Sequence, residues 1–153
     1  MMQRRHFLKN TMATGAVAMA AASGLLVPVQ VLAWNKSGAF DAESVGSVIK
    51  AATGGDATAS DKIKIKAPDI AENGAVVPVT ISSTLKDVTS ISILSEKNGH
   101  PLVAKFDLHG AEAFISTRIK MGTTSNIIAV CESGGKAYKA HKEVKVTIGG
   151  CGG

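Results

Sequence analysis

The sequence predicts an all-β sandwich with a short helix before its strands and a thin segment after them. From Lys62 onward, short runs rich in Val, Ile and Thr are separated by clusters of Gly, Asn, Pro and Ser, a pattern typical of all-β proteins. The chain has 153 residues, of which 45% are hydrophobic and 19% charged, and this suits one globular domain with its own core. The last five residues, Gly-Gly-Cys-Gly-Gly, have almost no side chains with which to pack.

Residues 1–33 are predicted to be an export signal that is removed from the mature protein. The pair Arg4-Arg5 precedes an uncharged stretch of mainly Ala, Gly, Met, Leu and Val that ends at Ala33. This arrangement resembles a twin-arginine signal, with Gln3 where Ser or Thr is more usual. We therefore expect export to the periplasm. The alternative is a single transmembrane anchor, since residues 10–33 are long enough to cross a bilayer.

The charge of the chain argues against a nucleic acid partner. Of the 17 Lys and Arg residues, three lie in the first ten positions, and the other 14 nearly balance the 12 Asp and Glu residues. One Trp, one Tyr and four Phe leave few rings to interleave with basic residues, as nucleic-acid-binding surfaces require.

The mature domain, residues 34–148, is predicted to begin with a short helix. Asp41 can cap this helix, and Gly54-Gly55 ends it. Apolar residues recur at helical spacing, at Val45, Val48, Ile49 and Ala52.

Seven candidate strands follow, and their number and spacing predict an immunoglobulin-like β-sandwich. They run from Lys62 to Lys66, Val76 to Ser82, Thr89 to Ser95, Leu102 to Leu108, Ala113 to Met121, Asn126 to Glu132 and Lys136 to Ile148. Turns at Lys97-Asn98-Gly99 and Gly134-Gly135 predict two hairpins, because Gly and Asn tolerate positive φ.

Two of these strands have unusual residues. Pro78 cannot donate a backbone hydrogen bond, so its strand should be an edge strand or carry a bulge. The strand from Asn126 to Glu132 is apolar on both faces. Such a strand either lies centrally in a covered sheet or faces a protein partner, and the pattern leaves both alternatives open.

Residues 149–153 are predicted to form a flexible arm that carries the chemistry of the protein. The arm consists of Cys151 and the glycines Gly149, Gly150, Gly152 and Gly153. Glycines make it thin and conformationally permissive, and its five residues let the sulfur swing on the order of 10 Å or more. A thiolate is a good nucleophile toward oxidised sulfur and a good leaving group from it. Cys151 is therefore the candidate site for covalent attachment of a sulfur substrate.

Disulfide formation gives two alternatives for Cys151. The first is an internal bond with Cys131, but the hairpin at Gly134-Gly135 places Cys131 opposite about Tyr138, 13 residues before Cys151. That separation is roughly 40 Å in strand geometry, whereas bridged Cα atoms lie within about 7 Å. Only a tail folded fully back would permit the bond, and Cys131 is more simply a small buried residue. The second alternative is a structural or adhesive module that is crosslinked to another chain through Cys151.

The other polar residues predict no metal site, no cofactor and no catalytic residues. His100, His109 and His141 lack metal-ligand spacing, and no Ser-His-Asp or paired-carboxylate pattern can be assigned. We therefore expect a non-catalytic protein. The last strand is basic at Lys136, Lys139, Lys142 and Lys145. These lysines are either an ordinary solvated face or a basic stripe that leads toward a tail carrying an anionic adduct.

Four internal segments and the tail together carry a resemblance to a known family. The segments are Ile70–Val79, Arg118–Met121, Thr124–Asn126 and Lys142–Thr147. With the terminal Gly-Gly-Cys-Gly-Gly and the twin-arginine leader, they resemble SoxY, the sulfur-carrier subunit of the Sox thiosulfate-oxidation system. Gln3 and the additional Cys131 depart from the simplest family pattern, and neither lies in the tail.

This resemblance implies an immunoglobulin-like domain that pairs with SoxZ and carries sulfur intermediates on the thiol of Cys151. It implies that the haem enzyme SoxXA joins thiosulfate to the thiol oxidatively and that the manganese hydrolase SoxB removes the terminal sulfonate as sulfate. Where SoxCD is present, the remaining sulfane sulfur would be oxidised on the carrier. The carrier itself would catalyse none of these steps.

Overall fold

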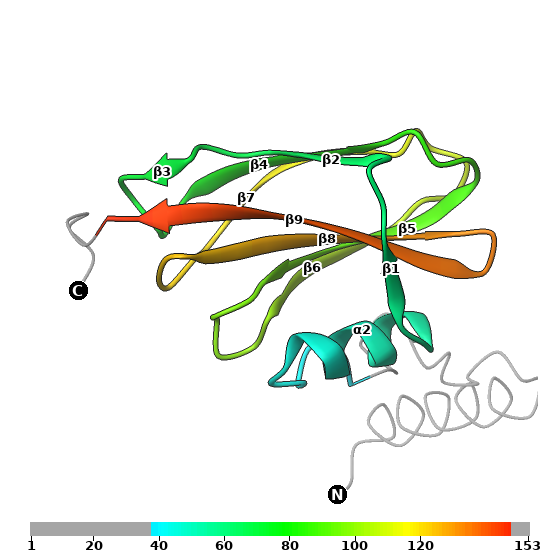
Figure 1. Ribbon diagram of the computed structural model, residues 1–153, viewed down its shortest axis with the longest axis horizontal. Helices are drawn as coiled ribbons and strands as arrows, with labels where there is room; N and C mark the ends of the chain where they lie inside the picture. The colour runs from blue at the N-terminus through cyan, green and yellow to red at the C-terminus, as the bar shows by residue number, and fades with distance from the viewer. Residues whose placement is uncertain (1–37, 148–153) are drawn as a thin grey trace, which may run out of the picture. The chain divides into compact units, whose positions relative to one another are not determined.

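The computed structural model describes residues 38–147, which form two β-sheets packed face to face and one helix on the outer side of the larger sheet (Figure 1). This arrangement confirms the predicted all-β sandwich with a short helix before its strands. The predicted export signal, residues 1–33, and the predicted arm, residues 149–153, lie outside the described residues. No helix within the described range has the length and apolar character needed to span a bilayer.

The larger sheet contains six strands within residues 38–147, in the order β1-β9-β8-β5-β6, and β3 also pairs with β9. The strands are β1 (Ala57–Ala59), β3 (Ile70–Ala71), β5 (Val88–Ser95), β6 (Leu102–Asp107), β8 (Ser125–Ser133) and β9 (Lys136–Val146). The pairs among β5, β6, β8 and β9 are antiparallel, whereas β1 and β3 run parallel to β9. One edge of β9 therefore pairs with β8, and the other pairs with β1 near its start and β3 near its end.

The smaller sheet has the order β2-β4-β7 and is antiparallel. Its strands are β2 (Ile63–Lys66), β4 (Val77–Ser83) and β7 (Phe114–Ile119). All seven predicted strands are thus present, as β2 and β4 to β9. The prediction missed β1 and β3, which have three and two residues, because strands so short contain no alternation to detect.

Pro78 predicts that its strand is an edge strand or carries a bulge, and this prediction is wrong for the strand as a whole. β4 lies between β2 and β7, and neither ladder has a register shift. The ladder with β2 stops at Thr80, whereas the ladder with β7 continues to Val77. Pro78 therefore lies where β4 is paired on one edge only, and a residue without an N–H is tolerated there.

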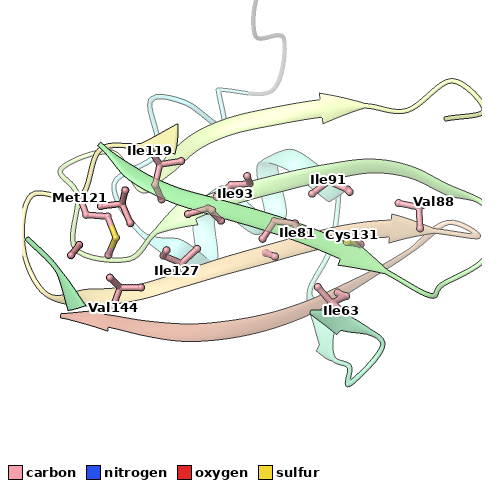
Figure 2. Close-up of a cluster of buried hydrophobic side chains, with 14 residues drawn as sticks. Ile63, Ile81, Val88, Ile91, Ile93, Ile119, Met121, Ile127, Cys131 and Val144 are labelled. Atoms are coloured by element: carbon pink, nitrogen blue, oxygen red, sulfur yellow. The ribbon is translucent and has the colours of Figure 1, made fainter. Parts of the chain in front are cut away.

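The main hydrophobic core fills the space between the two sheets (Figure 2). Ile81 of β4, Ile91 and Ile93 of β5 and Ile127 of β8 are all fully buried in it. The two-residue period of a strand sends alternate side chains to one face, so the alternating runs in the sequence become the facing layers of this core.

β8 is apolar on both faces because both of its faces are covered. The face that includes Ile127 packs in the core between the sheets, and the face that includes Ile128 packs beneath the helix with Val48 and Ile49. Of the two alternatives for this strand, the central position in a covered sheet is therefore correct.

The helix, α2 (Val45–Thr53), ends as predicted at Gly54, whose φ of 75° is left-handed. Its N-cap is Ser44 rather than Asp41, so that prediction is wrong. Ser44 Oγ accepts a hydrogen bond from Ser47 N at 3.2 Å, and Ser47 Oγ accepts one from Ser44 N at 3.3 Å. This reciprocal capping box satisfies backbone donors that a helix start otherwise leaves unpaired.

Both predicted hairpins are present. The turn at Lys97-Asn98-Gly99 links β5 to β6, and Gly134-Gly135 links β8 to β9. Gly134 and Gly135 have φ values of 57° and 73°, as a tight turn with two left-handed residues requires.

Candidate functional site at the end of β9

The structure describes the chain as far as Thr147, four residues before Cys151. Cys151 and the other predicted arm residues lie outside the described range: Gly149, Gly150, Gly152 and Gly153. The base from which this segment departs is described, and we call Lys145–Thr147 the β9 end. Three parts of the chain hold it.

The outer edge of the β9 end pairs with β3. The two segments run in parallel register, with Ala71 opposite Val146. Lys145 N donates to the Asp69 carbonyl oxygen at 2.9 Å, and Thr147 N donates to the Ala71 carbonyl oxygen at 3.1 Å. The outer edge is therefore hydrogen-bonded up to the last described residue.

The inner edge of the β9 end is held by one hydroxyl group. The ladder between β8 and β9 reaches its last pair at Ser125 and Val144. Beyond that pair, Thr124 Oγ1 accepts a hydrogen bond from Val146 N at 2.9 Å and donates to the Val146 carbonyl oxygen at 3.4 Å. The side chain of Thr124 thus continues the ladder where the backbone of β8 no longer does.

The turn between β3 and β4 closes the third side. Asn73 Oδ1 accepts a hydrogen bond from Ala75 N at 2.9 Å, which shapes the turn, and Met121 N donates to the Gly74 carbonyl oxygen at 2.7 Å. A Cβ atom at Gly74 would lie 2.5 Å from the Met121 carbonyl oxygen and 2.8 Å from Val146 Cγ1. Both distances are far below ordinary contact, so this close approach to the β9 end requires glycine.

An ion pair links the start of β3 to β9. Lys142 Nζ lies 2.9 Å from Asp69 Oδ1. The hydrogen bond from Lys142, and then its positive charge, hold the pKa of the Asp69 carboxyl below its usual range. Of the predicted basic stripe, Lys142 is therefore paired, and Lys145 is an exposed lysine at the β9 end itself.

Cys131 is fully buried in the core between the sheets, as predicted for a small apolar residue (Figure 2). It lies opposite Tyr138 of β9, as the hairpin predicts. Burial raises the pKa of its thiol to about 11, against a smaller opposing effect of a hydrogen bond with Ser83. At neutral pH this thiol stays protonated, and a protonated thiol is a poor nucleophile.

The length of β9 argues against an internal disulfide. Tyr138 and Thr147 are nine residues apart, which is roughly 30 Å along a strand. The four residues from Thr147 to Cys151 span at most about 14 Å. Because bridged Cα atoms lie within about 7 Å, even a tail folded fully back would not bring Cys151 to Cys131.

The three described histidines, His100, His109 and His141, belong to no cluster of potential metal ligands. Within residues 38–147, no three side chains of His, Cys, Asp or Glu gather as metal ligands would. The β9 end connects the described domain to the other cysteine of the sequence, Cys151.

The hydrophobic periodicity of the sequence does not identify Thr124 or Gly74 as functional residues. Both lie in segments that resemble SoxY, and these segments are far apart in sequence. Ile70–Val79 and Thr124–Asn126 both reach Lys142–Thr147 at the end of β9. The described site is thus the place where these segments converge.

Comparisons with known proteins identify the family of the chain. The family model "Sulfur oxidation protein SoxY" matches residues 49–151, which include Cys151. The solved structure of the sulfur carrier protein SoxY from Chlorobium limicola f thiosulfatophilum is 46% identical, with a TM-score of 0.60, and the match covers 65% of this chain and 93% of that chain.

A second solved structure is described as "Structural basis of T cell specificity and activation by the bacterial superantigen toxic shock syndrome toxin-1". It matches at 9% identity and a TM-score of 0.40, over 56% of this chain and 99% of that chain. A TM-score this low does not show a shared fold. No curated protein matches the chain significantly. The family match extends over more than half of the sequence, and the chain therefore belongs to the SoxY family of sulfur oxidation proteins.

Proposed function

We propose that this protein is a sulfur carrier that binds thiosulfate-derived intermediates covalently through the thiol of Cys151. The observation that carries the proposal is the family match, which runs through the tail to residue 151. The 46% identical structure is also that of a protein described as a sulfur carrier.

The chemistry of the two thiols supports this assignment. Burial keeps the Cys131 thiol protonated, whereas sulfur chemistry needs a thiolate that reagents can reach. Cys151 is the other cysteine of the chain. Its neighbours Gly149, Gly150, Gly152 and Gly153 would give it a thin backbone suited to a narrow active site.

The proposed cycle balances without a catalytic group on the carrier. Coupling of the Cys151 thiolate to the outer sulfur of thiosulfate forms a sulfur–sulfur bond and releases two electrons, which SoxXA would accept. Hydrolysis by SoxB would then break the bond to the sulfonate group. Water supplies the new oxygen, sulfate leaves, and a persulfide stays on Cys151. The carrier thus acts as the substrate of its partner enzymes and needs no cofactor of its own.

The proposal includes a location and an assembly. The leader with Arg4-Arg5 would direct folded protein to the periplasm by the twin-arginine route. There the domain would pair with SoxZ and dock transiently with SoxXA, SoxB and, where present, SoxCD. Disulfides form readily in an oxidising compartment. The distance between Cys131 and Cys151 and the burial of Cys131 both disfavour a disulfide between them, so the Cys151 thiol would stay available there.

We expect the Cys151→Ser variant to carry no sulfur, because serine has no thiolate to couple with thiosulfate. Cys131→Ala is the matched control and should load as the wild type does, since Cys131 is buried. The measurement is the intact mass of the protein purified from the periplasm after thiosulfate feeding, before and after reduction, with the C-terminal peptide mapped.

Reducible sulfur confined to the Cys151 peptide of the wild type and of Cys131→Ala is the expected result. Sulfur that remains on Cys151→Ser would overturn the assignment of the site. A wild-type tail found only in one stable protein disulfide would instead identify a crosslinked structural module.

A further inference from the structure

We propose that Ala71, Gly74 and Thr124 form a clamp that fixes the point at which the carrier segment leaves the domain, so that the Cys151 thiol is delivered from a defined position. We call these three residues the β9 clamp. The inference rests on the proposed carrier function, and it assigns positioning roles to residues that take no part in the sulfur chemistry.

The backbone of β9 is hydrogen-bonded beyond the end of the β8 ladder. The last β8–β9 pair is Ser125 and Val144. Thr124 Oγ1 nevertheless holds Val146 on the inner edge, and the Ala71 carbonyl oxygen holds Thr147 N on the outer edge. A strand end without such partners frays.

The clamp is closed by a turn with no space for a side chain. Gly74 lies against both Met121 and Val146, where a Cβ atom would be 2.5 Å and 2.8 Å from the nearest atoms. Met121 is 2% exposed and bonds the Gly74 carbonyl oxygen at 2.7 Å. The turn therefore packs on a buried neighbour, which makes the third side of the clamp rigid.

A fixed β9 end affects delivery because it sets the length of chain between the domain and the thiol. Once the domain is docked on an enzyme, entry of the tail into the active site is an intramolecular event, and its effective concentration falls roughly as the −3/2 power of the flexible length. With the clamp closed, four residues separate Thr147 from Cys151. Fraying back to Val144 would make that length seven residues, which lowers the effective concentration about twofold.

The convergence of segments supports the same conclusion independently. Ala71 and Gly74 lie in one segment and Thr124 in another about 50 positions later, and the resemblance to SoxY rests on both segments. Their contacts meet on Val146 and Thr147. A purely local turn would need none of these long-range contacts to the last residues of β9.

The test uses the loaded carrier in its native heterodimer and compares Thr124→Val with Thr124→Ser. Valine matches threonine in shape but lacks the hydroxyl that bonds Val146, whereas serine retains it. Thr123→Val is the matched control, because Thr123 is an exposed neighbour. A fourth variant inserts three glycines after Thr147, which lengthens the segment between the β9 end and Cys151 without touching the clamp.

Three quantities are measured for each variant. Hydrogen exchange at the amides of Val146 and Thr147 reports whether the β9 end is held. Single-turnover sulfate release from thiosulfate-loaded carrier by the partner hydrolase, at subsaturating enzyme, reports delivery. Reaction of the reduced tail with a small aromatic disulfide reports the intrinsic reactivity of the thiol.

We expect Thr124→Val to exchange faster at Val146 and to release sulfate two- to threefold more slowly, with unchanged reactivity toward the small disulfide. The glycine insertion should slow release to a similar extent, and Thr124→Ser and Thr123→Val should match the wild type. If Thr124→Val released sulfate at the wild-type rate, whether exchange at Val146 were fast or slow, the clamp would be overturned while the carrier function stands. A wild type that holds no sulfur would overturn the carrier function and, with it, the role of the clamp.

Discussion

Cys131 of β8 lies between Ile91 of β5 and Tyr138 of β9, and none of its surface is exposed. Desolvation disfavours the thiolate, so the pKa of the thiol rises to about 11. A second cysteine in a sulfur carrier is a hazard, because thiolates exchange with disulfides and persulfides. Its place in the core removes that hazard without removing the residue.

Alkylation measures how well Cys131 is protected. Because the pKa is raised, the thiolate, which is the reactive form, is a minor fraction below about pH 11, and this fraction increases with pH. A shift from 9.0 to about 11 lowers the thiolate fraction at pH 8 roughly a hundredfold. We expect iodoacetamide to label Cys131 in the Cys151→Ser variant at least about 100-fold more slowly in native protein than in urea. Rapid native labelling, followed by mass spectrometry, would contradict its burial.

At the scale of single elements, α2 depends on a cap that the sequence does not single out. Ser44→Ala removes the hydroxyl that accepts from Ser47 N, and loss of such a cap costs about 1 kcal/mol. We expect the free energy of unfolding in urea to fall by that amount. Glu43→Ala, at an exposed neighbour, should change it by less than about 0.5 kcal/mol. Equal effects of the two substitutions would show that the capping box contributes nothing.

The elements divide into those that the sequence predicts and those that it cannot. Runs rich in Val, Ile and Thr between turn residues predict each long strand, and the Gly134-Gly135 hairpin even predicts that Cys131 lies opposite Tyr138. Asp41 and Ser44 are both good caps before the same apolar pattern, so periodicity predicts a helix but not its first residue.

The short parallel strands and the β9 clamp were not predictable for a different reason. β3 has two residues and pairs with a partner roughly 75 positions later, and no local pattern records such a pairing. The bond from Thr124 to Val146 likewise spans 22 positions. The assignment of chemistry to the tail stays a prediction from its local composition, whereas the anchorage of the β9 end depends on tertiary contacts that no local pattern records.

At the scale of the whole molecule, stability depends on the layer between the two sheets. Ile81→Ala should lower the free energy of unfolding by about 3 kcal/mol, because Ile81 is fully buried and truncation there leaves a cavity. Phe114→Ala on neighbouring β7 is the comparison, since Phe114 is 53% exposed on the outer face. We expect its cost, measured in the same urea titration, to be below about 1 kcal/mol. A larger cost for Phe114→Ala than for Ile81→Ala would contradict the sandwich as described.

The parallel pairing of β1 and β3 with β9 also sets an order of events in the life of the chain. Ala57 pairs with Ala137, so the larger sheet joins the first described strand to the last. Contacts so distant in sequence make folding slow, and they cannot form while β9 is still being synthesised. The domain therefore completes its fold only after translation has passed residue 146, the last residue of β9.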